Sequence, residues 1–456
     1  MSKNKADFGT GSMPKLILKQ ALPLALSQLA QLLYNTVDRI YIGHIQENSI
    51  APLTGLGLTF PIISAILAFT LLFGQGGCPI FSITRGEGDT KKAARIMGNS
   101  FTLLTICGVV LTFVLFFFAK PILYLLGAGP DSFPYAYSYL RIYVWGTMFV
   151  TLGSGMNYYI TAQGSPVIAM ITTMSGAVLN LILDPLFIFY FDMGIRGAAI
   201  ATLISQFVSF AWVMRFFIPK FGGTAVIPLT RASTKLNLRI VGSIVAMGFT
   251  GFVMEITNSL TQITCNRTLK HYGGEVFVGI MTIVNSVRAI MGIAVNGIVQ
   301  GAQPVLGYNY GAKKYNRVRI GITCSSLFAF AYTAFAWACV FFFPGFFIGL
   351  FSDDKATNAL AIPYLHIFFM AYVFMSLQFS GQSTFMALGK AKRAIFFSLF
   401  RKVILVIPLT LLLPLVMSDP VSGVFYAEPI SNVVGGAASF TAMYFTIYRK
   451  LPKTDS

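Results

Sequence analysis

Apolar runs of similar length follow one another along almost the whole chain, and they leave it few ways to fold. A helix needs about 20 predominantly apolar residues to cross the hydrocarbon core of a bilayer. Because a segment in lipid must satisfy its backbone hydrogen bonds internally, we predict an all-α membrane protein of about 12 transmembrane helices. The runs occupy residues 16–42, 50–80, 93–118, 134–160, 166–191, 196–218, 238–264, 276–303, 320–345, 360–386, 394–416 and 421–447.

Composition excludes a soluble protein of the same length. Only 11% of the 456 residues are charged, against about a quarter in soluble domains, and the mean hydropathy is +0.72. The five cysteines are scattered and show neither metal-binding spacing nor a disulfide framework. The sequence carries no phosphate-binding loop and no nucleophile motif. We therefore expect a protein that is not an enzyme and has no cofactor.

The formal net charge of +18 does not indicate nucleic-acid binding, because of where the basic residues stand. They gather at alternate ends of the apolar runs, as the positive-inside rule describes for cytoplasmic loops. This placement predicts a multi-pass protein that is surrounded by membrane lipids, has both termini in the cytoplasm and has no nucleic-acid partner. The clusters are Lys3 to Lys19, Arg85 to Arg95, Lys220 to Arg239, Lys313 to Arg319, Lys390 to Lys402 and Arg449 to Lys453.

The chain divides into two halves that resemble each other. The one long polar connection, residues 219–237, separates six runs in residues 1–218 from six in residues 238–456. At a shift of 225 residues, Gln75-Gly76 lies over Gln300-Gly301, and Gly86 lies over Gly311. Six spans in each half put both copies the same way up in the membrane. Two such lobes suit alternating access, although chance matching of common membrane residues is the alternative.

An acid stands inside the fifth apolar run. Asn180 and Asp184 are four residues apart and share one helix face. Pro185 follows at once and removes the backbone donor that would reach the Leu181 carbonyl. A carboxylate at this depth costs several kcal/mol unless it is paired, protonated or bound to an ion. We interpret the spot as a cation site; a helix kink with a neutral, hydrogen-bonded Asp is the alternative.

Two further runs carry groups that can complete this spot. Asp38 lies in the first run at a similar predicted depth, with Tyr34 and Asn35 one turn before it. Thr202 begins the sixth run among small residues, which allow close backbone approach. The alternatives are an interfacial acid paired with a basic residue for Asp38, and a hydroxyl bonded to its own helix for Thr202.

The second half opens with a polar stripe that offers acceptors to a cation. Glu255, Asn258 and Gln262 recur at helical spacing in the seventh run. We predict that this stripe binds substrate together with Tyr34, Asn35 and the adaptable side chain of Met174. A hydrogen-bonded packing stripe is the alternative, and Glu428, just before Pro429, is a further candidate.

Together these residues resemble the multidrug and toxic compound extrusion (MATE) family of antiporters, over nearly the whole chain. The resemblance rests on the acids at 38, 184 and 255, on Asn180 and Thr202, and on the repeated Gln-Gly segments. It implies a V-shaped pair of six-helix lobes that exports lipophilic organic cations in exchange for H⁺ or Na⁺. The basic loops and the Glu428-Pro429 ending look most like the bacterial branch, which implies the cytoplasmic membrane of a bacterium.

The resemblance also assigns roles to single residues. It places H⁺ or Na⁺ at Asp38, Asn180, Asp184 and Thr202, with Tyr139 as a hydrogen-bonding neighbour. Some members carry a further acid in the tenth helix, and residues 360–386 have none. At the 225-residue shift Asp184 lies over Leu409, so we expect the cation to bind in the first half alone.

The expected mechanism is competition between drug and cation. Two carboxylates in one buried spot cannot both stay charged at low cost, so one takes a proton or Na⁺ fills the spot. We expect a monomer that exchanges cationic amphiphilic drugs for this cation. A lipid-linked sugar flippase of a related fold is the alternative, and it would line its cavity with arginines, for which Arg141 and Arg288 are the candidates. A membrane enzyme or a channel would need a clustered motif or acid rings.

Overall fold

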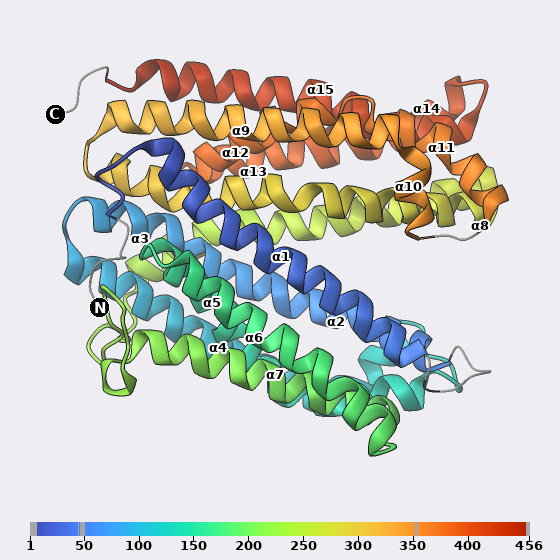
Figure 1. The fold of residues 1–456 in the computed structure, drawn as a ribbon, viewed down its shortest axis with the longest axis horizontal. Helices are drawn as coiled ribbons and strands as arrows, with labels where there is room; N and C mark the ends of the chain where they lie inside the picture. The colour runs from blue at the N-terminus through green and yellow to red at the C-terminus, as the bar shows by residue number, and fades with distance from the viewer. Residues whose placement is uncertain (1–6, 44, 46–50, 352–353, 453–456) are drawn as a thin grey trace. The chain divides into compact units, whose positions relative to one another are not determined.

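The computed structural model describes residues 7–43, 45, 51–351 and 354–452. The predicted cytoplasmic residues Lys3, Lys5 and Lys453 lie outside these ranges. All regular structure within them is helical, which confirms the all-α prediction (Figure 1). The α-helices are α1 (Met13–Gly43), α2 (Ala51–Thr70), α3 (Gly76–Gly86), α4 (Thr90–Leu125), α5 (Phe133–Ala162), α6 (Pro166–Pro185), α7 (Gly194–Phe217), α8 (Leu238–Gly311), α9 (Tyr315–Phe342), α10 (Pro344–Gly349), α11 (Lys355–Phe369), α12 (Met375–Ala387), α13 (Ala391–Leu399), α14 (Ile407–Val416) and α15 (Pro420–Thr446).

Six shorter helical segments interrupt or follow these helices. Three are π-helices, which occur frequently at functional sites: η1 (Leu71–Gln75), η2 (Leu186–Tyr190) and η5 (Phe400–Val406). The others are 3₁₀ turns: η3 (Pro219–Phe221), η4 (Tyr372–Phe374) and η6 (Tyr448–Lys450). Each π-helix continues an α-helix, so η2 extends α6 and η5 joins α13 to α14.

Many of these helices cross a membrane alone or joined to a neighbour. Among the described residues, 9 helical segments are long and apolar enough, some of them made of consecutive helices such as α13, η5 and α14, and a bent pair formed by α11 and α12 raises the number to 10. The 74-residue α8 is itself two helices, because its backbone leaves the helical region at Gly274 with φ 75° and ψ −167°. That positive φ favours glycine, which has no Cβ to clash. The tyrosine-rich α5 has 30 residues, enough to span, although it is less apolar.

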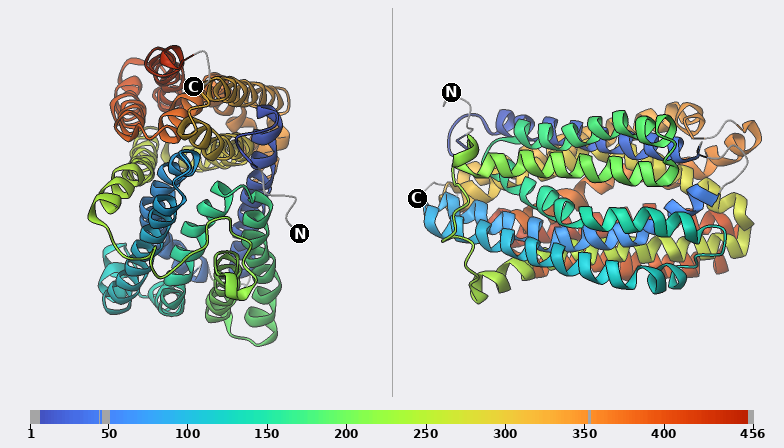
Figure 2. Two further views of the ribbon diagram at one scale, coloured as in Figure 1. Left: turned by 90° about the vertical axis from the view of Figure 1, so that its left-hand side faces the viewer. Right: turned by 90° about the horizontal axis from the view of Figure 1, so that it is seen from below.

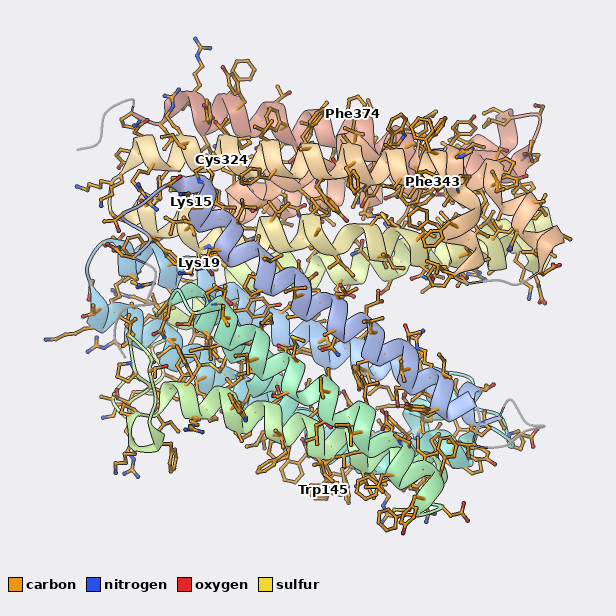
Figure 3. All side chains as sticks on the ribbon, viewed as in Figure 1. Lys15, Lys19, Trp145, Cys324, Phe343 and Phe374 are labelled. Atoms are coloured by element: carbon orange, nitrogen blue, oxygen red, sulfur yellow. The ribbon has the colours of Figure 1, made fainter. Side chains whose placement is uncertain are left out.

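Large apolar side chains cover the outside of the helices. Leu125, Phe117 and Phe342 are 87%, 69% and 69% exposed. Trp145 of α5, labelled in Figure 3, is also exposed, and its ring lies edge-on to that of Phe116 on α4. Water-soluble proteins rarely expose contiguous apolar surface on this scale, whereas lipid tails solvate it. The protein is therefore a multi-pass membrane protein.

The chain folds into two compact units, and the division does not follow the polar connection. The first unit comprises Met1–Asp7 and Leu26–Gly251, and the second comprises Phe8–Ala25 and Phe252–Ser456. The boundaries fall inside α1 and α8. The opening turns of α1 pack within the second unit, where Ile17 joins a core cluster with Ala302 and Leu306. Within each unit the helices run in broadly similar directions (Figure 2).

Helix ends repeat at the shift of 225 residues. Helices α3 and α8 end at Gly86 and Gly311, and the following helices begin at Thr90 and Tyr315. Helices α5 and α12 end at positions 162 and 387, and the next helices start at 166 and 391. The two halves are therefore copies of one helical arrangement.

Glycines allow helices to touch backbone to backbone at equivalent places in the two units. A Cβ on Gly248 of α8 would lie 1.7 Å from the Leu72 carbonyl oxygen in the first unit. A Cβ on Gly301 of the same helix would lie 2.8 Å from the Ala21 nitrogen of α1 in the second unit. Backbone atoms cannot move aside as flexible side chains can, so these contacts require glycine.

We expect Gly248→Val to destabilise the folded protein by about 3 kcal/mol, because the added side chain must displace the backbone of η1. The apparent melting temperature of the detergent-solubilised protein measures the effect. Gly242→Val is the matched control on the same helix, since no atom lies within 4 Å of a Cβ at Gly242. Equal melting temperatures for the two variants would contradict the close contact.

The polar connection 219–237 is held against the first unit by two buried amides. Gln163 donates from Nε2 to the Ile227 carbonyl at 3.2 Å and accepts from the Ile227 N–H at 2.9 Å. Asn99 donates from Nδ2 to the Lys235 carbonyl at 3.0 Å and accepts from the Asn237 N–H at 2.8 Å. Each amide satisfies both a donor and an acceptor of the connection, which therefore packs as part of the first unit.

Candidate functional site

A buried polar cluster lies inside the first unit. It brings together Asp38 of α1, Asn180 and Asp184 of α6, Thr202 of α7 and Tyr139 of α5. Their exposed fractions lie between 0% and 7%, so each side chain is removed from lipid and water. All five residues of the predicted cation site are therefore neighbours, although they come from four helices.

Local sequence explains how α6 and α7 approach each other at this cluster. Pro185 ends the α-helical part of α6, and the chain continues as the π-helix η2. A Cβ on Gly197 of α7 would lie 2.6 Å from the carbonyl carbon and oxygen of Phe187 in η2. Because Gly197 has no side chain, α7 packs directly on this backbone, and Thr202 reaches Asn180.

Asn180 links the members of the cluster through its amide nitrogen. Its Nδ2 donates to Asp184 Oδ1 at 3.2 Å and to Thr202 Oγ1 at 3.3 Å. The carboxyl groups of Asp38 and Asp184 lie next to each other in the cluster. Ionised carboxylates have only acceptor atoms, so two of them meet favourably only with a proton or a cation between them.

Three buried oxygen atoms of the cluster have no hydrogen-bond partner: Asp38 Oδ1, Asn180 Oδ1 and Asp184 Oδ2. A buried polar atom without a partner costs about 1–3 kcal/mol, so three in one place indicate a ligand. All three are hard oxygen acceptors, the type that suits an alkali cation or a shared proton. In the described part of the chain, no group of three or more His, Cys, Asp or Glu residues is arranged so that it could hold a metal ion.

Tyrosines form one wall of the cluster. The phenol groups of Tyr34 and Tyr139 lie close to the Thr202 hydroxyl. Tyr143 stacks on Tyr139 with ring centroids 5.8 Å apart, and its hydroxyl faces Gln206. Tyr34 was predicted to bind substrate, whereas Tyr143 and Gln206 were not among the predicted site residues. The four-residue spacing of Tyr139 and Tyr143 on α5 is the signal that could have found Tyr143.

The other predicted substrate residues are not part of this cluster. Asn35 is exposed, and Met174 and Glu255 are half-buried. None of the salt bridges among the described residues involves Glu255. Asn258 and Gln262 line a cavity within the second unit. The residues predicted to bind substrate are thus divided between the two units.

That cavity also borders a group of charged side chains that contact one another. Glu428 of α15 is in ion-pair contact with Arg401, Lys402 and Arg288. Arg401 and Lys402 lie inside the candidate span Ala391–Val416, where they are only 7% and 6% exposed. The prediction that they belong to a cytoplasmic basic cluster was wrong, because both side chains are buried and paired with Glu428. The sequence did not indicate this pairing, since Glu428 lies 26 or more residues later in the chain.

Comparisons with known proteins identify the family. The MatE family model matches residues 23–186 and again residues 250–412. Multidrug export protein MepA of Staphylococcus saprophyticus is 25% identical over 401 residues, which cover 88% of this chain and 87% of that protein. A MepA protein of Staphylococcus aureus is 24% identical over 394 residues, covering 86% and 85%.

A solved structure shares the fold. It is an outward-facing conformation of a multidrug resistance MATE family transporter of the MOP superfamily, with a TM-score of 0.92, 21% identity and full coverage of both chains. The two segments that match the family model span well over half of the chain and reproduce its internal repeat. The protein therefore belongs to the MATE family, whose members are membrane transporters and not enzymes.

Proposed function

We propose that the protein exports lipophilic organic cations in exchange for H⁺ or Na⁺, and that the coupling ion binds at Asp38, Asn180, Asp184 and Thr202. The observation that carries this proposal is the convergence of two buried carboxyl groups with three partnerless oxygen atoms. The multidrug export function of the MepA relatives supports the substrate class. The family match favours this function over a lipid-linked sugar flippase.

Exchange follows from the cost of leaving this site without a cation. When the ion leaves, the two carboxyl groups must separate or recruit another cation, because both cannot stay charged in a buried spot. Either response changes how α1, α6 and α7 pack, and Pro23 of α1 is a natural bending point. A cationic drug and the coupling ion then compete for the protein, each favouring a different packing.

The experiment uses proteoliposomes that contain the purified protein and a fluorescent organic cation. A Na⁺ gradient and a pH gradient are imposed separately, each without the other. We expect efflux to follow at least one gradient and to be absent from liposomes without protein. Efflux that responds to neither gradient would exclude antiport.

Replacement of Thr202 by Val should weaken ion coupling without abolishing it. The hydroxyl accepts one hydrogen bond from Asn180 and lies beside two phenol groups. A hydrogen bond contributes about 0.5–1.5 kcal/mol, so we expect the ion concentration for half-maximal efflux to rise by roughly 2–10-fold. Thr202→Ser keeps the hydroxyl and should retain the wild-type value. Equal values for both variants would remove Thr202 from the site.

We further propose that the protein is a monomer in the cytoplasmic membrane of a bacterium, with both termini in the cytoplasm. The positive-inside placement of lysines and arginines supports the orientation, and the staphylococcal relatives support a bacterial host. Fusion of a reporter that is active only in the cytoplasm should give signal at either terminus. Signal at one terminus alone would contradict an even number of spans.

A further inference from the structure

We propose that the second unit contains a binding site for an anionic group, a carboxylate or a phosphate, in the cavity beside Glu428. The cavity has a volume of about 140 Å³ and is lined by polar and charged side chains of α8, η5 and α15. A cavity of about 150 Å³ holds a benzene molecule, so this one has room for a small oxyanion or for the head of a larger ligand. This site is separate from the proposed coupling-ion site in the first unit.

The charges around the cavity do not balance. Arg288 and Arg401 carry permanent positive charges, Lys402 adds a third when it is protonated, and all three contact the same atom, Glu428 Oε1. Every ion pair that these three residues form with described residues ends on Glu428. One carboxylate offsets one charge, so the two arginines alone leave one positive charge without a partner within a membrane-spanning unit. Uncompensated charge at such a place costs several kcal/mol, and an entering anion would offset it.

The geometry leaves donors available to a ligand. Arg288 Nη1 and Lys402 Nζ both lie 3.4 Å from Glu428 Oε1, longer than the 2.7–2.9 Å typical of strong charge-assisted hydrogen bonds. Arg401 is held more firmly, at 3.1 Å from Glu428 and 2.6 Å from Asn432 Oδ1. Arg401 therefore anchors Glu428. Arg288 and Lys402 line the cavity, and their N–H groups make only long hydrogen bonds to Glu428.

Neutral side chains add to the recognition of an oxyanion. Asn258, Gln262 and Asn285 line the same cavity and each carries an amide NH₂ donor. Phe368 provides an apolar wall, and the Arg288 guanidinium lies 5.9 Å from the centre of its ring. A planar guanidinium beside an aromatic wall suits a carboxylate on an apolar or aromatic body. Soluble carboxylates and phosphates fit this chemistry, and so do anionic lipid head groups.

Binding is measured without transport, so the result does not depend on the proposed export. The full-length protein is prepared in neutral detergent, and its melting temperature is followed with benzoate or inorganic phosphate at constant ionic strength, using chloride as the reference salt. A second series uses nanodiscs of phosphatidylcholine with and without phosphatidylglycerol. We expect saturable stabilisation by a soluble anion or by the anionic lipid, and the series that responds identifies the source.

Two variants connect the effect to the cavity. Arg288→Gln and Lys402→Gln each remove a basic side chain that lines the cavity and leave Glu428 paired with Arg401, so we expect both to fold and to need at least tenfold more anion for half-maximal stabilisation. Arg267→Gln is the matched control, because Arg267 is exposed on α8 and does not line the cavity. Stabilisation that is absent from wild type, or that persists unchanged in both cavity variants, would overturn the proposal.

Discussion

We expect replacement of Asp184 by Asn to lower the initial rate of ion-driven efflux at least tenfold. The carboxyl group of Asp184 is fully buried, accepts a hydrogen bond from Asn180 and lies beside the carboxyl group of Asp38. Asn preserves the shape and much of the hydrogen bonding but cannot take up or release a proton at this pH, and it offers no charge to Na⁺. The fold should therefore survive while the coupling is lost.

Efflux of a fluorescent cation from proteoliposomes measures this loss at equal protein density. Asp38→Asn should behave in the same way, and the double variant should lose no more than either single variant, because both carboxyl groups serve one ion. The control is Asp192→Asn, an exposed acid just after η2 whose φ of 53° asparagine readily adopts. Full efflux by Asp184→Asn at normal expression would show that the acid does not couple transport.

Replacement of Glu428 by Gln should give the largest loss of stability in the second unit. Glu428 is the partner of three basic side chains, two of them less than 10% exposed. Removal of one member of a buried ion pair typically costs about 3–5 kcal/mol, because an unpaired charge is left behind. The melting temperature of the solubilised protein should fall clearly, and added anion should recover part of it.

Two further variants separate charge balance from shape in this cluster. Glu428→Gln combined with Lys402→Gln removes one cation as well and should melt above Glu428→Gln alone. Glu275→Gln makes the same chemical change in the exposed pair with Lys270, where the expected cost is below about 1 kcal/mol. If Glu428→Gln and Glu275→Gln melt alike, the cluster does not depend on its single carboxylate.

The sequence predicted the helical fold and the first-unit cluster because both depend on local patterns. Apolar runs define spanning helices, and the four-residue spacing of Asn180 and Asp184 places both on one face of α6. The small residues of α7 predicted the close approach that brings Thr202 to them. Tyr139 was assigned through the family resemblance alone, and Tyr143 beside it was missed.

What the sequence did not predict depends on partners that are distant along the chain. Arg401 and Lys402 look like loop charges because they stand near a basic cluster, and only the position of Glu428 shows that they are internal. The packing of the first turns of α1 within the second unit depends on Gly301 and Ala21, which are 280 positions apart. The helical spacing of apolar and polar residues does not predict contacts between residues so far apart in the sequence.

The most direct test of the central claim is ion displacement by substrate in the purified protein. Tetraphenylphosphonium is added to the protein in weakly buffered detergent, while released H⁺ and bound ²²Na⁺ are measured. We predict that wild type releases H⁺ or Na⁺ on binding this cation, and that Asp38→Asn and Asp184→Asn release neither. Equal ion release by wild type and both variants would contradict a coupling site at these two acids.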